Sequence, residues 1–97
     1  MSEKRIRTSI ETEFEVRGRR ATGKIKNVSE GGLFVGTAAI PEEGENVALR
    51  FRSPMGGEVS VSGLVWWTTE GVARRVHGFG LRVLDDSPEF RALVADL

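Results

Sequence analysis

The chain has 97 residues, no cysteine, one histidine, and 14 basic side chains balanced by 14 acidic ones. This length fits one small domain, and the composition excludes disulfide scaffolds, thiolate metal sites and histidine-rich metal sites. The charged N-terminus has no apolar segment behind it, and no stretch approaches the roughly 20 apolar residues of a membrane span. We therefore expect a cytoplasmic protein with no membrane insertion.

The balanced charge conceals an asymmetry along the chain. Residues 1–26 hold eight Lys or Arg against four Glu, a net charge of +4, and the other 71 residues hold six Arg against ten acids, a net charge of −4. Zero overall charge argues against binding of long nucleic acid. The basic N-terminal region, in contrast, suits a small anion.

The first predicted strand follows from alternation of apolar and charged side chains, which is typical of a half-buried strand. Its inward positions are Ile10, Thr12, Phe14 and Val16. Gly18 ends this pattern, and a second strand is predicted from about residue 20 to 28. The turn-rich residues 27–32 then lead into a short apolar strand, 33–35.

Three more strands are predicted in the second half, over residues 47–52, 59–67 and 77–83. The turn-forming sequence 53–57 joins the first two as a hairpin. Gly63 lies inside the most β-prone stretch, so we expect a bend or a close backbone approach there. We treat His77 as a structural residue of the core or barrel mouth, because it alternates with Phe79 and Leu81.

At the end of the chain, the spacing of the apolar residues changes from that of a strand to that of a helix. Ser87 suits a helix cap, Pro88 suits the first helical position, and an amphipathic stripe follows at Phe90, Leu93, Val94 and Leu97. Six short strands joined by glycine-containing turns favour an antiparallel barrel or sandwich, against which the short helix must pack.

Two adjacent tryptophans point to opposite faces of a regular strand. The alternation of Val59, Val61 and Val65 assigns Trp67 to the core and Trp66 to the outer surface. Nucleophilic catalysis has poor support, because His77 is the only imidazole base in the sequence. We therefore expect no enzymatic activity.

The most informative group of candidate binding residues combines the N-terminal arginines with the turn at residues 27–32. Guanidinium groups bind guanine edges and phosphates through paired hydrogen bonds. The turn adds the polar side chains of Asn27 and Ser29 and a glycine, Gly32, whose backbone a nucleotide can approach closely. Taken alone, the motif is merely a favourable turn sequence, and Lys4, Arg5 and Arg7 are more often a solvated tail.

The whole chain resembles the PilZ domain, the bacterial receptor module for cyclic di-GMP. The segment from Asn27 to Val35 resembles the family's D/N-x-S-x-x-G motif with its apolar continuation. Arg7, residues 40–51, residues 61–67 and residues 78–81 match further pieces in order and spacing. The resemblance covers residues 7–84 and implies a six-stranded antiparallel β-barrel with a short C-terminal helix, in agreement with the periodicity.

The resemblance also implies a ligand site. In the family an R-x-x-x-R element wraps over the nucleotide, and the second motif contacts a guanine and the phosphate-sugar ring. Carried over by position, the second arginine is Arg7 and the motif residues are Asn27, Ser29 and Gly32. The position of the first arginine is occupied by Glu3, and Lys4 or Arg5 is the candidate replacement. We therefore predict ligand contacts from Arg5, Arg7, Asn27, Ser29 and Gly32.

The implied protein is a non-enzymatic regulator with cyclic di-GMP as ligand and no other cofactor. A flexible segment, residues 1–9, would order over the ligand on a barrel formed by residues 10–97, and the ordered surface would signal to an unidentified partner protein. The alternative, favoured by Glu3, is a PilZ-like adaptor that has lost the nucleotide and acts through protein contacts. A third possibility, a binder of single-stranded nucleic acid, rests only on Trp66, Arg50 and Arg52.

Overall fold

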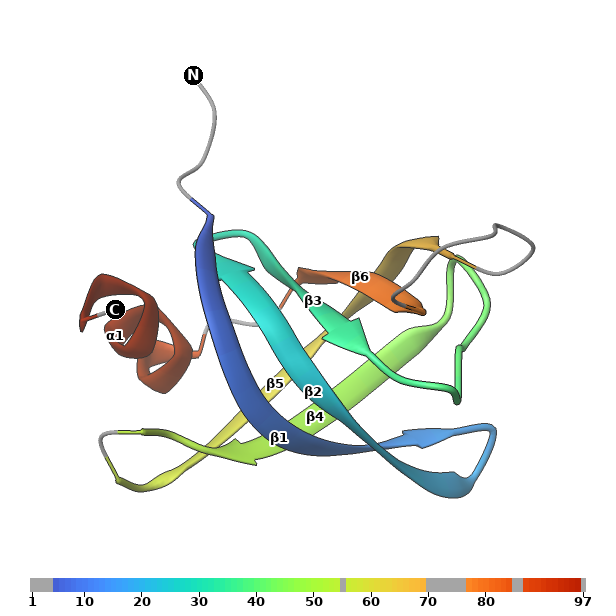
Figure 1. Cartoon of the computed structure of the whole chain (residues 1–97), viewed down its shortest axis with the longest axis horizontal. Helices are drawn as coiled ribbons and strands as arrows, with labels where there is room; N and C mark the ends of the chain where they lie inside the picture. Colours follow the sequence, from blue (N-terminus) through green and yellow to red (C-terminus); the bar gives the residue numbers. More distant parts are fainter. Residues whose placement is uncertain (1–4, 55, 70–76, 85–86, 97) are drawn as a thin grey trace.

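The computed structural model describes residues 5–54, 56–69, 77–84 and 87–96. Six antiparallel strands form a closed barrel in the order β1-β2-β3-β6-β5-β4 (Figure 1). The strands are β1 (Ile6–Val16), β2 (Arg19–Ser29), β3 (Gly32–Gly36), β4 (Asn46–Arg52), β5 (Glu58–Thr68) and β6 (Gly78–Val83), and one helix follows, α1 (Pro88–Asp96). The predicted barrel with a C-terminal helix is confirmed.

The first strand starts earlier than the alternation predicts. β1 begins at Ile6, so Arg7 lies inside the strand and is paired with Asn27 of β2, instead of lying ahead of it. At the other end of β1, Arg17 and Gly18 have positive φ values of 52° and 79° and form the tight turn into β2. Arg17 Nη2 lies 2.8 Å from a carboxylate oxygen of Glu42.

The core fills the barrel with the inward residues of all six strands. Predicted inward residues Ile10 and Phe14 are buried, and Phe14 meets Phe79 edge to face with ring centroids 5.5 Å apart. The close approach expected at Gly63 is confirmed, because a β-carbon there would lie 2.2 Å from the carbonyl oxygen of Arg82.

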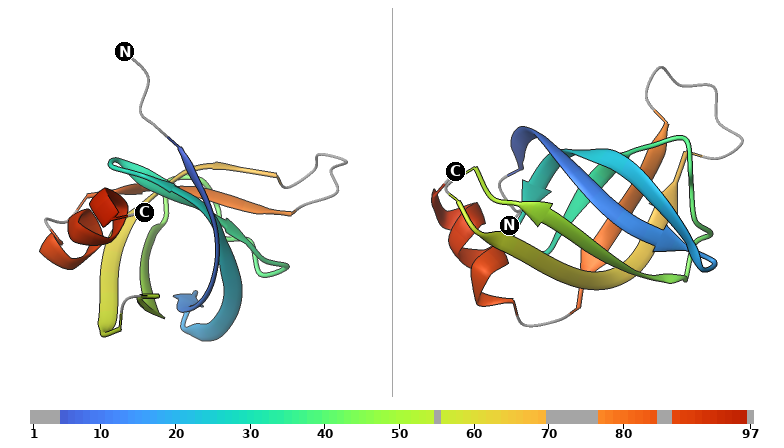
Figure 2. Two further views of the ribbon diagram at one scale, coloured as in Figure 1. Left: turned by 60° about the vertical axis from the view of Figure 1, so that its left-hand side comes forward. Right: turned by 90° about the horizontal axis from the view of Figure 1, so that it is seen from below.

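The helix begins as predicted. The hydroxyl of Ser87 accepts a hydrogen bond from the backbone N–H of Phe90 at 3.2 Å, which caps the helix. Phe90, Leu93 and Val94 are buried in the core cluster, whereas Leu97 lies outside the described residues. Figure 2 shows α1 at one end of the barrel, where it packs against β5.

Candidate functional site

One cross-strand row places two of the predicted site residues on the same face as an aromatic pair. Arg7 of β1 is paired with Asn27 of β2, and Asn27 is also paired with Phe34 of β3. Phe34 is paired with Gly80 of β6, which in turn is paired with Trp67 of β5. The row therefore crosses five of the six strands.

Irregularities in the strand pairing lie in or beside this row. Register shifts occur between Arg7 and Ile10, between Ile25 and Asn27, and between Val65 and Trp67. A β-bulge inserts an extra residue and turns the side chains beyond it to the other face. The bulges thus set which side chains the row presents to solvent.

The prediction that Trp67 belongs to the core is wrong. Trp67 is 37% exposed, because the bulge after Val65 reverses the alternation and turns the indole outward. Its ring stacks on Phe34 with centroids 5.2 Å apart and planes 20° apart. The stack also explains Gly80, since a β-carbon there would lie 2.3 Å from the indole nitrogen of Trp67.

Trp66 lies on the outer surface, as predicted. It is 57% exposed, and the guanidinium carbon of Arg82 lies 5.0 Å from the centroid of the indole ring. This is the geometry of a cation–π contact. Neither Arg82 nor the outward Trp67 was identified from the sequence, because both depend on the pairing of β5 with β6.

Arg5 and Asn27 contact each other directly. Arg5 Nη1 donates a hydrogen bond of 2.5 Å to Oδ1 of Asn27, which is half-buried. This contact joins the N-terminal basic residues to the motif turn, although 22 residues separate the two side chains in the chain. Because Arg5 occupies the amide oxygen, Asn27 keeps its amide N–H groups for another acceptor.

Ser29 and Gly32 close the turn between β2 and β3. Ser29 is 2% exposed, and its hydroxyl lies 3.4 Å from the carbonyl oxygen of Gly32. A β-carbon on Gly32 would lie 2.4 Å from the carbonyl oxygen of Leu81. Gly32 therefore has a packing role between β3 and β6, whatever ligand role it has.

A surface cavity of about 320 Å³ brings part of the predicted site together with the tryptophans. Its lining residues are Arg5, Ser29, Gly31, Gly32, Leu33, Trp66, Trp67, Gly80, Leu81 and Arg82. Asn27 does not line it but reaches it through Arg5. The cavity combines two guanidinium groups with two indole rings.

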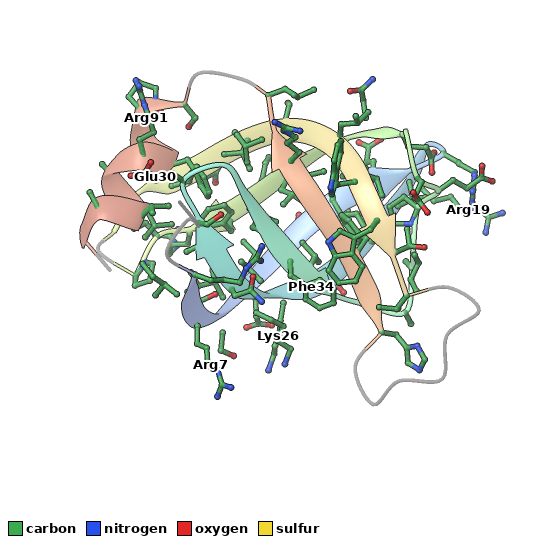
Figure 3. All side chains as sticks on the ribbon, turned by 90° about the horizontal axis from the view of Figure 1, so that it is seen from above. Arg7, Arg19, Lys26, Glu30, Phe34 and Arg91 are labelled. Atoms are coloured by element: carbon green, nitrogen blue, oxygen red, sulfur yellow. The ribbon has the colours of Figure 1, made fainter. Side chains whose placement is uncertain are left out.

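Arg7 lies apart from this cavity. In Figure 3, Arg7 and Lys26 project side by side from the edge next to Phe34, which lies on the facing surface. Both side chains are exposed and add positive charge near the cavity. Glu3 and Lys4, on which the motif comparison depends, lie outside the described residues.

A larger hollow of about 660 Å³ crosses the outer surface of β1 and its neighbours. Its charged residues alternate in sign across the strands: Lys24, then Glu11 and Glu13, then Arg50 and Arg52, then Glu58. A guanidinium nitrogen of Arg50 lies 3.6 Å from a carboxylate oxygen of Glu13. Because the charges cancel within the hollow, the smaller cavity suits an anion better.

His77 was predicted to lie in the core or at the barrel mouth, and the structure excludes the core. Its side chain is exposed, and β6 begins one residue later, at Gly78. The carbonyl oxygen of His77 accepts a hydrogen bond from the backbone N–H of Thr37 at 2.9 Å. The alternation that includes Phe79 and Leu81 therefore starts after His77.

Among the described residues, no three or more histidines or acids are grouped so as to hold a metal ion. None of the described helical segments has the length and apolar character needed to cross a bilayer.

The comparisons with known proteins agree with this architecture. Residues 1–97 match the model of the PilZ domain. The structure of the Bacillus subtilis inhibitor of motility (MotI/DgrA) is similar, with a TM-score of 0.80 and 16% sequence identity. The similarity covers 99% of this chain and 48% of that one, so this chain spans about half its length. No curated protein matches the sequence.

Proposed function

The chain belongs to the PilZ domain family, and on that premise we propose that it is a non-enzymatic regulator that binds cyclic di-GMP. The ligand would occupy the cavity between Arg5 and the two tryptophans. Binding would fix Arg5 and the residues before it over the nucleotide, ahead of the start of β1 at Ile6, and thereby change the surface that a partner protein meets in the cytoplasm. The observation that carries the proposal is the convergence of Arg5, Ser29 and Gly32 with Trp66 and Arg82 around one cavity.

The charges of the cavity match those of the ligand. Cyclic di-GMP carries two phosphodiester groups, each with one negative charge, and Arg5 and Arg82 both line the cavity. Guanidinium groups form paired, charge-assisted hydrogen bonds with phosphate. Arg7 and Lys26 would add long-range attraction from the neighbouring edge.

The aromatic side chains provide surfaces for the guanine bases. Base stacking on an aromatic side chain is worth about 1–3 kcal/mol. Trp66 is well exposed, and Trp67 lies outside the core with its ring stacked on Phe34. Neither indole therefore has to move out of the core to meet a base. Arg5, held by Asn27, can donate to O6 and N7 of a guanine.

Isothermal titration of the full chain with cyclic di-GMP tests the proposal. We expect saturable binding with one class of site, and absence of heat at about 50 µM protein, where a ligand of micromolar affinity would be mostly bound, would contradict it. Glu3→Arg restores the first motif arginine and should tighten binding by about one to two decades, the value of a charge-assisted contact. Unchanged affinity would mean that Arg5 already replaces the missing arginine.

A second candidate function is a PilZ-like adaptor without a nucleotide. Glu3 favours it, because a carboxylate repels the phosphates that an arginine would neutralise. The two candidates differ in the titration with cyclic di-GMP, because an adaptor gives no heat there. An adaptor still binds its partner protein without the nucleotide. A turnover assay with cyclic di-GMP addresses catalysis separately, and hydrolysis would overturn the non-enzymatic assignment.

A further inference from the structure

Phe34 is a buried aromatic residue on the outer side of the barrel. Its neighbours in β3, Leu33 and Val35, belong to the core cluster, so the side chain of Phe34 points to the opposite face. The ring is only 7% exposed there. Phe34 does not line the proposed ligand cavity, and none of the proposed ligand contacts involves it. Its burial on a solvent-facing surface therefore needs a separate explanation.

The indole of Trp67 lies against two groups of the barrel surface. Its five-membered ring lies over Gly80, where a β-carbon would come within 2.8 Å of three of the ring atoms. The indole is also stacked on Phe34, with centroids 5.2 Å apart and planes 20° apart. Because Phe34 is 7% exposed and Trp67 is 37% exposed, the phenyl ring is the inner member of the stack and the indole is the outer one. The exposed indole in turn lines the ligand cavity.

The backbone of β6 fixes the position of Phe34. A β-carbon on Gly78 would lie 2.9 Å from Cζ of Phe34, so this ring too lies over a glycine. Gly78 and Gly80 alternate along β6 with Phe79, whose side chain is in the core. The outer surface of β6 therefore has no side chain at these two positions, and the two rings occupy that space. Close packing against backbone leaves a ring few alternative rotamers.

Trp66 has a different kind of neighbour. The guanidinium carbon of Arg82 lies 5.0 Å from the centroid of its indole, and Trp66 is 57% exposed. An arginine side chain has many rotamers and therefore restrains a ring less than a packed phenyl ring does. The two indoles of the cavity thus differ, because Trp67 is held by packing and Trp66 is free to adjust.

We propose that Phe34 is a positioning residue of the ligand cavity, which holds Trp67 over β6 as a preformed stacking surface for a guanine base. This inference rests on the proposed function. A side chain that is already ordered loses no rotamer freedom when the ligand binds, whereas ordering a mobile one lowers affinity by about three- to tenfold. Phe34 therefore raises the affinity for the nucleotide without touching it.

Isothermal titration of two matched variants with cyclic di-GMP tests the proposal. Phe34→Leu removes the support of the indole and should weaken binding by about three- to tenfold. Phe14→Leu removes a ring from the core, where Phe14 meets Phe79 edge to face. This control should lower the free energy of unfolding at least as much and change the affinity by less than about twofold. Equal losses of affinity in both variants would indicate a general effect of lower stability and would overturn the proposal.

A positioning residue acts through the residue that it positions, which a double-mutant cycle measures. In a Trp67→Ala chain, Phe34→Leu should weaken binding by less than about twofold, because there is no indole left to hold. A loss of the same size with and without the indole would overturn the proposal. Gly80→Ala displaces the indole from its other support and should weaken binding by a similar factor, so the test does not depend on the folding of Phe34→Leu.

Fluorescence without ligand separates this inference from the proposed function. The chain has two tryptophans, so Trp66→Phe leaves Trp67 as the single one. We expect the anisotropy of Trp67 to decay with the tumbling of the whole chain, and Phe34→Leu to add a faster component from motion of the indole alone. If the natural chain binds no cyclic di-GMP, the proposed function fails, and the decay alone then decides the positioning role. An unchanged decay in Phe34→Leu overturns that role whatever the titration shows.

Discussion

The barrel has two outer faces that differ in the contacts their residues make. On the face of β1 and β2, oppositely charged residues stand opposite each other, as with Glu11 and Lys24 or Glu15 and Arg20. On the face of β3, β6 and β5, aromatic rings lie over glycines, as with Trp67 over Gly80. The first face tolerates change, because exposed ion pairs contribute little. The second is fixed by close contacts and forms the candidate ligand cavity.

The largest expected effect on stability is that of a substitution at Gly32, on the face of β3, β6 and β5. Gly32→Ala forces a β-carbon against the carbonyl oxygen of Leu81, which would lie 2.4 Å away. Because backbone must shift, we expect the free energy of unfolding to fall by about 3 kcal/mol. Gly18→Ala, with nothing within 4 Å but a φ of 79°, should cost only about 1 kcal/mol. Urea denaturation measures both, and similar losses would contradict the packing role of Gly32.

Arg5 should matter for the ligand and little for the fold. Arg5→Ala removes a charge-assisted contact and should weaken cyclic di-GMP binding by about 1.5–3 kcal/mol, or roughly ten- to hundredfold. Arg19→Ala, an exposed arginine at the far end of the barrel (Figure 3), should change affinity less than about twofold. Equal losses in the two variants would indicate a nonspecific charge effect.

Trp66 should contribute a smaller part of the binding. Trp66→Ala removes a stacking surface and the ring under Arg82, and we expect a loss of about 1–2 kcal/mol in ligand affinity. Since Trp66 is 57% exposed, thermal unfolding should change little. An unchanged affinity would exclude base stacking on this indole.

The smallest effect is expected on the charged face. Glu13→Gln removes the partner of Arg50 at 3.6 Å between two exposed side chains. The free energy of unfolding should change by less than about 0.5 kcal/mol, and the change should vanish at high salt. A loss above about 1 kcal/mol would show that this face is more rigid than its exposure implies.

Local patterns were sufficient to predict most of the fold. The alternation around Phe14 and the cap at Ser87 each depend on neighbours in the sequence, and both are confirmed. The position of Trp67 depends on the register between β5 and β6, which alternation alone does not encode. The exclusion of His77 from the core has a related reason, because the alternation alone does not indicate that β6 begins at Gly78.

The candidate site was predicted only in part. Arg5, Ser29 and Gly32 do line one cavity, and Asn27 reaches it through Arg5. Arg82, 50 residues or more from each of them in the chain, was missed, because its place on the cavity follows from barrel closure. The contacts of all these residues with a ligand remain predictions.

The most direct test of the account is a titration of the 15N-labelled chain with cyclic di-GMP, followed by NMR. The chain has only two tryptophans, so two indole N–H signals report on the cavity. We predict that both signals shift together with the amides of Ser29, Gly32 and Arg82. The amides of Glu11, Glu13 and Arg50 in the larger hollow should stay in place. Shifts confined to that hollow, or no shift at saturating ligand, would contradict the assignment of the site.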